Sequence, residues 1–183
     1  DGTFKGEYTD KTMKLINEIL DANDAKLDIE PGDMDILKKA STRNDYFGLN
    51  YYQPSYFAAY NGESTNHFNG TGEKGTSSFK FKGVGQAVKN PNIPTTDWDW
   101  NIYPEGLYDI LKRVSSEYPN SKEIFITENG LGLKEELPEG ATQDTIINDD
   151  KRIDFVDQHM EAILKARSEG VNVNGYFIWS LQD

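Results

Sequence analysis

The chain contains no cysteine and only two histidines among its 183 residues. The lack of cysteine excludes disulfide bonds and thiolate nucleophiles, and it removes the commonest structural zinc ligand. His67 lies in a polar segment and His159 in a helical one, and neither has a second ligand at metal-binding spacing. We therefore expect neither a metal site nor a cofactor.

The sequence also lacks a long hydrophobic run and an excess of positive charge. No apolar stretch approaches the roughly 20 residues that a membrane-spanning helix requires. Nineteen basic residues against 31 acidic ones give a net charge of −12, which disfavours binding to nucleic acid or to an anionic membrane. The sequon at Asn69–Thr71 matters only in a secreted protein, and no leader sequence is recognisable. We expect a cytoplasmic protein that binds neither nucleic acid nor membrane.

Three short runs of aliphatic and aromatic residues, at 44–53, 124–130 and 173–183, have the composition of buried strands. They are apolar on both faces, which is typical of strands in a parallel sheet that is covered by helices. Apolar residues recur at helical spacing in four further segments, residues 11–20, 31–40, 104–118 and 149–169. Asp10 is the expected N-cap of the first helix. The residues expected to face inward from the last helix are Ile153, Val156, Met160, Ile163 and Leu164.

The alternation of strands and helices predicts a parallel α/β barrel. A closed barrel of eight such units needs about 250 residues, more than this chain has. We therefore expect residues 1–183 to form the C-terminal part of a (β/α)8 TIM barrel, with about the last three strands and their helices, incomplete in this chain. Residues 61–95 are rich in Gly, Asn, Ser and Lys and predict a loop or hairpin insertion at the top of the barrel, with Phe79–Lys82 as a short exposed strand.

The three strand candidates end in side chains that suit a polyhydroxylated ligand. Glu128 is the first ionisable residue after the apolar run that begins at Ile124, and in barrels the active site lies at the carboxyl ends of the strands. Asn50 and Tyr52 end the preceding strand, and Trp179 ends the last one. Carboxylates and amides bind hydroxyl groups, while aromatic rings pack on the apolar faces of a sugar. The alternative is that Glu128 is an ordinary solvated residue at the start of a loop.

Four motifs, in matching order, resemble glycoside hydrolase family 1. Thr127–Gly130 resembles the nucleophile motif of that family; the other three are Asn50–Tyr52, Tyr103–Leu107 and Tyr176–Leu181. Within the family, Thr96–Trp100 and residues 72–85 look most like the members that act on 6-phospho-β-galactosides. Many other members are expected to have glycine at the position of Asp99.

The resemblance implies a retaining β-glycosidase that hydrolyses 6-phospho-β-galactosides such as phosphorylated lactose, its expected small-molecule partner. Glu128 would be the nucleophile, and the Tyr52 hydroxyl would position it. Asn50 would hydrogen-bond the sugar or the region of Glu128. Trp179 would form the floor under the glycone ring. Trp100 would pack on the leaving group, with a core aromatic as the alternative for this residue.

The general acid that such an enzyme needs has no candidate in the sequence. Asn17–Glu18 has the required residue types, but it lies in the middle of a predicted helix on its solvated face. Gly70–Gly75 satisfies a dinucleotide-binding pattern without the strand and helix that this site requires, so we interpret it as loop. We expect the chain alone to be inactive and to self-associate through open strand edges. Open alternatives are a 6-phospho-β-glucosidase, an unphosphorylated β-glycosidase and a non-catalytic carbohydrate-binding protein.

Overall fold

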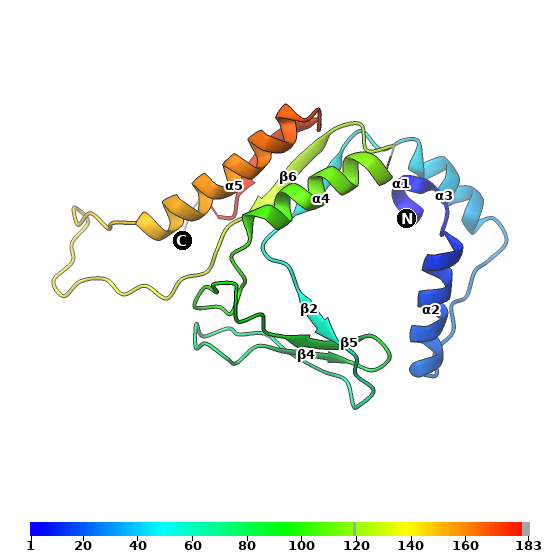
Figure 1. The fold of residues 1–183 in the computed structure, drawn as a ribbon, viewed down its shortest axis with the longest axis horizontal. Helices are drawn as coiled ribbons and strands as arrows, with labels where there is room; N and C mark the ends of the chain where they lie inside the picture. The colour runs from blue at the N-terminus through cyan, green and yellow to red at the C-terminus, as the bar shows by residue number, and fades with distance from the viewer. Residues whose placement is uncertain (119, 181–183) are drawn as a thin grey trace.

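Five helices and two sheets make up the fold in a computed structural model that describes residues 1–118 and 120–180 (Figure 1). The helices are α1 (Gly2–Lys5), α2 (Asp10–Ala22), α3 (Asp33–Ser41), α4 (Pro104–Glu117) and α5 (Asp150–Ser168). The first sheet contains β1 (Phe47–Asn50), β6 (Ile124–Asn129) and β7 (Val173–Ile178). The second contains β2 (Tyr56–Ala58), β3 (Thr65–His67), β4 (Ser78–Phe81) and β5 (Gly85–Val88).

The first sheet is parallel, in the order β1-β6-β7. Helix α4 precedes β6 and α5 precedes β7, and the two helices pack beside each other along the sheet (Figure 1). The core lies between this helix pair and the sheet. Its most deeply buried members are Leu107, Leu111, Val114, Ile124, Ile126, Ile163, Ala166 and Val173. Strand and helix thus alternate as in a barrel, but the described sheet is only part of one, because a closed barrel has eight strands.

Within residues 1–118 and 120–180, the opposite face of the parallel sheet has no helix layer of its own. Phe125 points away from its buried neighbours Ile124 and Ile126, because successive side chains of a strand alternate. It contacts Tyr46 edge-on, with ring centroids 5.2 Å apart. At the edge strand β7, Phe177 is 57% exposed. Hydrophobic side chains that a closed barrel would cover are therefore exposed here.

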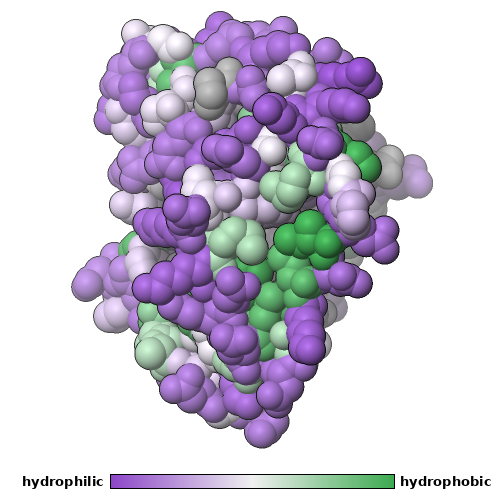
Figure 2. Space-filling view, turned by 90° about the vertical axis from the view of Figure 1, so that its right-hand side faces the viewer, coloured by the Kyte–Doolittle hydropathy of each residue, from purple (hydrophilic) through white to green (hydrophobic). Residues whose placement is uncertain are grey.

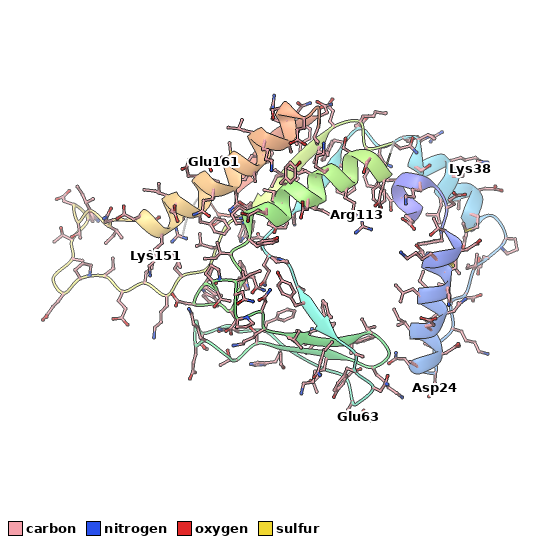
Figure 3. All side chains as sticks on the ribbon, in the orientation of Figure 1. Asp24, Lys38, Glu63, Arg113, Lys151 and Glu161 are labelled. Carbon is pink, nitrogen blue, oxygen red and sulfur yellow. The ribbon has the colours of Figure 1, made fainter. Side chains whose placement is uncertain are left out.

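A further hydrophobic surface lies on the side of the molecule that carries α1 to α3. Figure 2 shows it as a green band between hydrophilic areas. Exposed hydrophobic residues of α2, α3 and the segment between them are Leu15, Leu27, Ile29, Met34 and Ile36. Charged residues such as Lys38, Lys151 and Glu161 lie on the exposed sides of their helices (Figure 3).

The second sheet is antiparallel, in the order β2-β5-β4-β3. The strand expected at residues 79–82 is confirmed as β4, which forms a hairpin with β5. This hairpin reaches the end of α2, where Asn23 Nδ2 donates to the carbonyl oxygen of Lys82 at 2.9 Å. Gly83 has a left-handed φ of 76°, and a Cβ there would overlap with Ala22. Glycine is thus required at the point where the hairpin turn meets the helix.

Two details of the predicted helices were wrong. The N-cap of α2 is Thr9 and not Asp10, because the Thr9 hydroxyl accepts a hydrogen bond from the Thr12 backbone N at 3.3 Å. In α5 the expected inward face is partly wrong: Ile153 is 64% and Leu164 58% exposed. The residues that α5 buries are Phe155, His159, Ala162, Ile163 and Ala166. The glycine-rich pattern at 70–75 lies in loop, as expected.

Candidate active site

Glu128 and Tyr52 meet at the carboxyl ends of two neighbouring parallel strands. Asn50 of β1 pairs with Glu128 of β6, and the Tyr51 backbone N donates to the Glu128 carbonyl oxygen at 3.0 Å. One residue further along, the Tyr52 hydroxyl donates to Glu128 Oε2 at 2.7 Å. Burial, followed by the hydrogen bond and the charge of Glu128, raises the pKa of Tyr52 above its ordinary value. The phenol therefore stays protonated and remains a donor to the carboxylate.

Asn129 ties the ends of all three strands together. Its side chain is fully buried, and its Nδ2 donates to the Tyr51 carbonyl oxygen of the β1 side at 2.7 Å. Its Oδ1 accepts from the hydroxyl of Tyr176 in β7 at 2.7 Å, and its carbonyl oxygen accepts from the Trp179 backbone N at 2.9 Å. Burial raises the pKa of Tyr176 to about 12, so this hydroxyl also stays a donor. The network holds the residue before it, Glu128, in a fixed position.

Trp179 follows β7 and approaches the end of β6 closely. A Cβ at Gly130 would overlap with the Trp179 carbonyl oxygen, so the glycine after Asn129 is required by this approach. The peptide bond between Trp179 and Ser180 is cis. The Trp179 side chain is 60% exposed and therefore accessible to a ligand. Of the related motif at Tyr176–Leu181, Leu181 lies outside the described residues.

The other two predicted residues lie beside the Tyr52–Glu128 pair. Asn50 Oδ1 accepts a hydrogen bond from Thr127 Oγ1 at 2.6 Å, so this amide is held next to the strand end. The Trp100 ring packs edge-on against Tyr52, with ring centroids 5.0 Å apart. All five predicted residues are thus joined by direct contacts or by the Asn129 network.

A cavity of about 610 Å³ opens at this place. Its lining residues are Tyr52, Asn69, Trp98, Trp100, Leu131, Gly132, Leu133, Glu135, Arg152, Trp179 and Ser180. The volume lies within the range of small-molecule sites, and the mixture of tryptophan rings with a few polar groups suits a sugar. Three of the five predicted residues, Tyr52, Trp100 and Trp179, line it. Glu128 and Asn50 are not lining residues, and Glu128 is bonded to the lining residue Tyr52.

Sequence reasoning missed Arg152, which fixes the cavity wall. Its guanidinium donates to Asp149 Oδ2 and Glu135 Oε2, both at 2.8 Å, and to the Leu131 carbonyl oxygen at 3.2 Å. These bonds attach the segment after β6 to the start of α5. The only sequence signal was the i, i+3 spacing of an aspartate and an arginine at a helix start. Sequence reasoning also assigned no role to Asn69 or to the carboxylate of Asp99.

The Asn17–Glu18 pair lies outside the site, and the described residues contain neither a metal cluster nor a membrane-spanning helix. Asn17 and Glu18 lie in the middle of α2 and are exposed, as expected. Among residues 1–118 and 120–180, no cluster of His, Cys, Asp or Glu could hold a metal ion. In the same part of the chain, no helix has the length and hydrophobicity to span a membrane.

Comparison with known sequences decides the family. The family model described as Glycosyl hydrolase family 1 matches residues 1–183. The chain belongs to this family. The resemblance carried by the four motifs is therefore confirmed.

Curated relatives of this family 1 chain include bacterial 6-phospho-beta-galactosidases. The 6-phospho-beta-galactosidase of Clostridium acetobutylicum is 55% identical over all 183 residues. The 6-phospho-beta-galactosidase 1 of Streptococcus pneumoniae serotype 4 is 52% identical over the same length. The chain spans 38% of the length of each of these relatives.

Solved structures of the family match the fold. A beta-glucosidase from Exiguobacterium marinum is 31% identical with a TM-score of 0.69, and the match covers 99% of this chain and 34% of that one. The family 1 beta-glucosidase from Thermotoga maritima is 28% identical with a TM-score of 0.67, covering 98% and 33%. The family 1 chain therefore has the α/β fold of part of a TIM barrel.

Proposed function

We propose that the chain is part of a retaining β-glycosidase that hydrolyses 6-phospho-β-galactosides, such as phosphorylated lactose, in the cytoplasm. The observation that carries this proposal is the carboxylate of Glu128, held by the Tyr52 hydroxyl at 2.7 Å beside a tryptophan-lined cavity. The 55% identity to a 6-phospho-beta-galactosidase supports the substrate class. We further propose that these residues form the C-terminal strands of the barrel, and we call the complete protein the full-length enzyme.

In the proposed mechanism Glu128 attacks the anomeric carbon while a second carboxyl group protonates the leaving oxygen. The bond to the leaving group breaks as the ester to Glu128 forms. The second group then removes a proton from water, which attacks the same carbon and releases Glu128. That group would come from the rest of the barrel, so the chain alone would be inactive.

The other residues would orient the sugar and the nucleophile. Tyr52 donates to Glu128 and keeps one oxygen of the carboxylate aligned for attack. Trp179, exposed at the end of β7, would lie under the glycone ring. Trp100, which packs against Tyr52, would contact the leaving group. Asn50 would bind a sugar hydroxyl or support the region of Glu128.

A second candidate is a β-glycosidase with another sugar preference, either a 6-phospho-β-glucosidase or an enzyme for unphosphorylated substrates. The solved structures with similar folds are beta-glucosidases, which favours this candidate. Asn50, Tyr52, Trp100 and Trp179 would bind the ring and the leaving group of either kind of substrate.

Substitution of Glu128 in the full-length enzyme tests the proposal. We expect Glu128→Gln to lower kcat roughly a thousandfold or more, because the amide is a far weaker nucleophile. The matched control is Glu123→Gln, just before β6, where the carboxylate accepts from Asn174 Nδ2 at 3.0 Å; it should retain near-parental activity. Nitrophenyl glycosides of 6-phosphogalactose, 6-phosphoglucose, galactose and glucose are the substrates.

Each result of this experiment has a defined meaning. A Glu128→Gln variant within tenfold of the parental rate would exclude Glu128 as the nucleophile. Faster turnover of 6-phosphoglucosides or of unphosphorylated glycosides would assign the second candidate. Sugar binding by the parent without hydrolysis of any of the four would identify a carbohydrate-binding protein.

A further inference from the structure

Two buried polar side chains outside the proposed mechanism, Asn69 and Asp99, join the insertion to the turn at residues 96–100. Asp99 has a left-handed backbone, with φ 64°, and its side chain is only 7% exposed. Its Oδ1 accepts a hydrogen bond from the Gly75 backbone N at 2.7 Å. Its Oδ2 accepts from Asn69 Nδ2 at 3.2 Å and from the Ser77 backbone N at 3.4 Å. One carboxylate thus receives three donors from the insertion.

Asn69 completes the connection from the side of the insertion. It is 8% exposed, and its Nδ2 also lies within hydrogen-bond distance of the carbonyl oxygens of Glu73, at 2.9 Å, and Asp97, at 3.2 Å. Its Oδ1 accepts from the backbone N atoms of Thr71, at 3.1 Å, and Gly72, at 2.9 Å. The Asn69 amide therefore bonds residues 71–73 of its own loop, and it also bonds Asp97 and Asp99 of the turn. We call Asn69 and Asp99 together the clasp.

The turn that the clasp holds carries Trp98 and Trp100, two of the three tryptophans that line the cavity. Thr96 Oγ1 accepts from the backbone N atoms of Trp98, at 3.2 Å, and Trp100, at 3.3 Å. The Thr96 backbone N donates to the Trp100 carbonyl oxygen at 2.8 Å, which closes the turn. Asp99 stands between the two tryptophans, so its left-handed backbone and its anchored carboxylate fix the direction of both neighbours. Both rings line the cavity.

The charge of Asp99 suits this role. Burial alone would raise the pKa of this carboxyl group, and it is the largest single influence. The donors from Gly75, Asn69 and Ser77, together with Lys89 at 3.6 Å, outweigh it and lower the pKa below its ordinary value. The group therefore stays ionised, and hydrogen bonds to an ionised acceptor are stronger than those between neutral groups.

We propose that Asn69 and Asp99 are positioning residues that hold Trp98 and Trp100 against the substrate cavity and thereby set the affinity for the glycoside. This inference rests on the proposed function. The path from the clasp to the nucleophile consists of direct contacts. Trp100 packs on Tyr52 at 5.0 Å, and Tyr52 donates to Glu128 at 2.7 Å. Because the clasp touches the wall and not the reacting atoms, its loss should weaken binding more than it slows the chemical steps.

Three variants of the full-length enzyme separate the possible roles of Asp99. Asp99→Asn keeps the size and tolerates the left-handed backbone, but it removes the charge. Asp99→Gly keeps the backbone conformation and removes the side chain. The control, Lys89→Met, removes the cation but leaves the carboxylate and its three donors in place. The Lys89 side chain is 72% exposed, and exposed ion pairs contribute little.

The readouts are kcat and KM for the preferred glycoside, together with amide hydrogen exchange. We expect both Asp99 variants to raise KM roughly tenfold while kcat changes about threefold or less, because the lost contacts act on binding. Amides of the insertion at 69–77 and of the turn at 96–100 should both exchange faster. Lys89→Met should leave KM and exchange near parental values.

An unchanged KM in both Asp99 variants would overturn the proposal, whatever the exchange shows. So would faster exchange confined to the insertion, because the turn would then hold its shape without the clasp. If the parental enzyme hydrolyses no glycoside, the proposed function fails separately. Exchange in the 96–100 turn, with and without the carboxylate, then decides whether Asp99 positions that turn.

Discussion

At the scale of single residues, the site depends on a carboxylate and a phenol that are 76 positions apart in the chain. Parallel pairing of β1 with β6 brings them together, and the buried amide of Asn129 prevents the strand ends from shifting. Gly130 allows the Trp179 carbonyl to approach where any side chain would collide. Each of these residues lies in a motif that the sequence already displayed. The contacts between the motifs required the structure.

Replacement of Tyr52 by phenylalanine tests the residue scale. Loss of one oriented donor to a reacting group costs on the order of 2 to 4 kcal/mol in a closed active site, so kcat of the full-length enzyme should fall roughly 30- to 1,000-fold. Because the pKa of Tyr52 is raised, its ionisation should not produce the alkaline limb of the pH profile, and that limb should keep its position in the variant. Tyr60→Phe, which removes an exposed hydroxyl bonded to the Glu63 carbonyl, is the control. An unchanged kcat in Tyr52→Phe would refute the assignment.

At the scale of helices and strands, local patterns predicted more than contacts between distant segments. The apolar spacing at 104–118 matches α4, and the run from Ile124 matches β6, because both elements bury the residues that define their pattern. In α5 the pattern failed, since His159 is buried while Ile153 is exposed. Periodicity identifies apolar positions, but it does not tell which of two stripes faces α4. The bonds from Asn69 to Asp99 join irregular segments without periodicity, so no local sequence pattern predicts them.

His159 provides a test at this scale. It is fully buried in α5, its ring stacks on Phe155 at 3.9 Å, and burial lowers its pKa. Unfolding allows the ring to bind a proton at a pKa of about 6.5. Its contribution to stability is therefore present above that pH and is lost as the pH falls through the lowered folded-state pKa.

We expect the thermal unfolding temperature of the full-length enzyme to fall less between pH 7.5 and 5.5 in His159→Leu than in the parent. The quantity compared is the change in unfolding temperature between pH 7.5 and 5.5. A loss of packing that lowers the unfolding temperature equally at both pH values does not alter this change. His67→Gln, on the exposed strand β3, should behave like the parent. Equal pH dependence in His159→Leu and the parent would contradict the buried neutral state.

At the scale of the whole molecule, the described parallel sheet has β1 and β7 as its edge strands, and the described helices cover one of its faces. The edge strand β7 exposes Phe177 and Ile178, and in the described sheet it has a neighbouring strand, β6, on one side only. Open edges of this kind pair with other chains unless charge or a covering segment prevents it. The other edge strand, β1, contacts α1, where the rings of Phe47 and Phe4 lie 4.6 Å apart. In Figure 1 the four-stranded sheet lies apart from the parallel sheet.

We therefore expect the isolated 183-residue chain to self-associate and to lack activity. Light scattering and size-exclusion chromatography should detect species larger than the 20.7 kDa monomer. Phe177→Lys should reduce the association, because a lysine on an edge strand opposes pairing. A monodisperse and active monomer would contradict the partial-barrel account.

Glu128 should form a covalent bond to the sugar during the reaction, and this intermediate can be trapped. A 2-deoxy-2-fluoro-β-galactoside 6-phosphate with a dinitrophenyl leaving group should inactivate the full-length enzyme by slowing release of the glycosyl ester. Peptide mass spectrometry should then locate one fluorosugar on Glu128, and Glu128→Gln should remain unlabelled. A fluorosugar attached to a different carboxylate, or inhibition without a covalent adduct, would contradict the account.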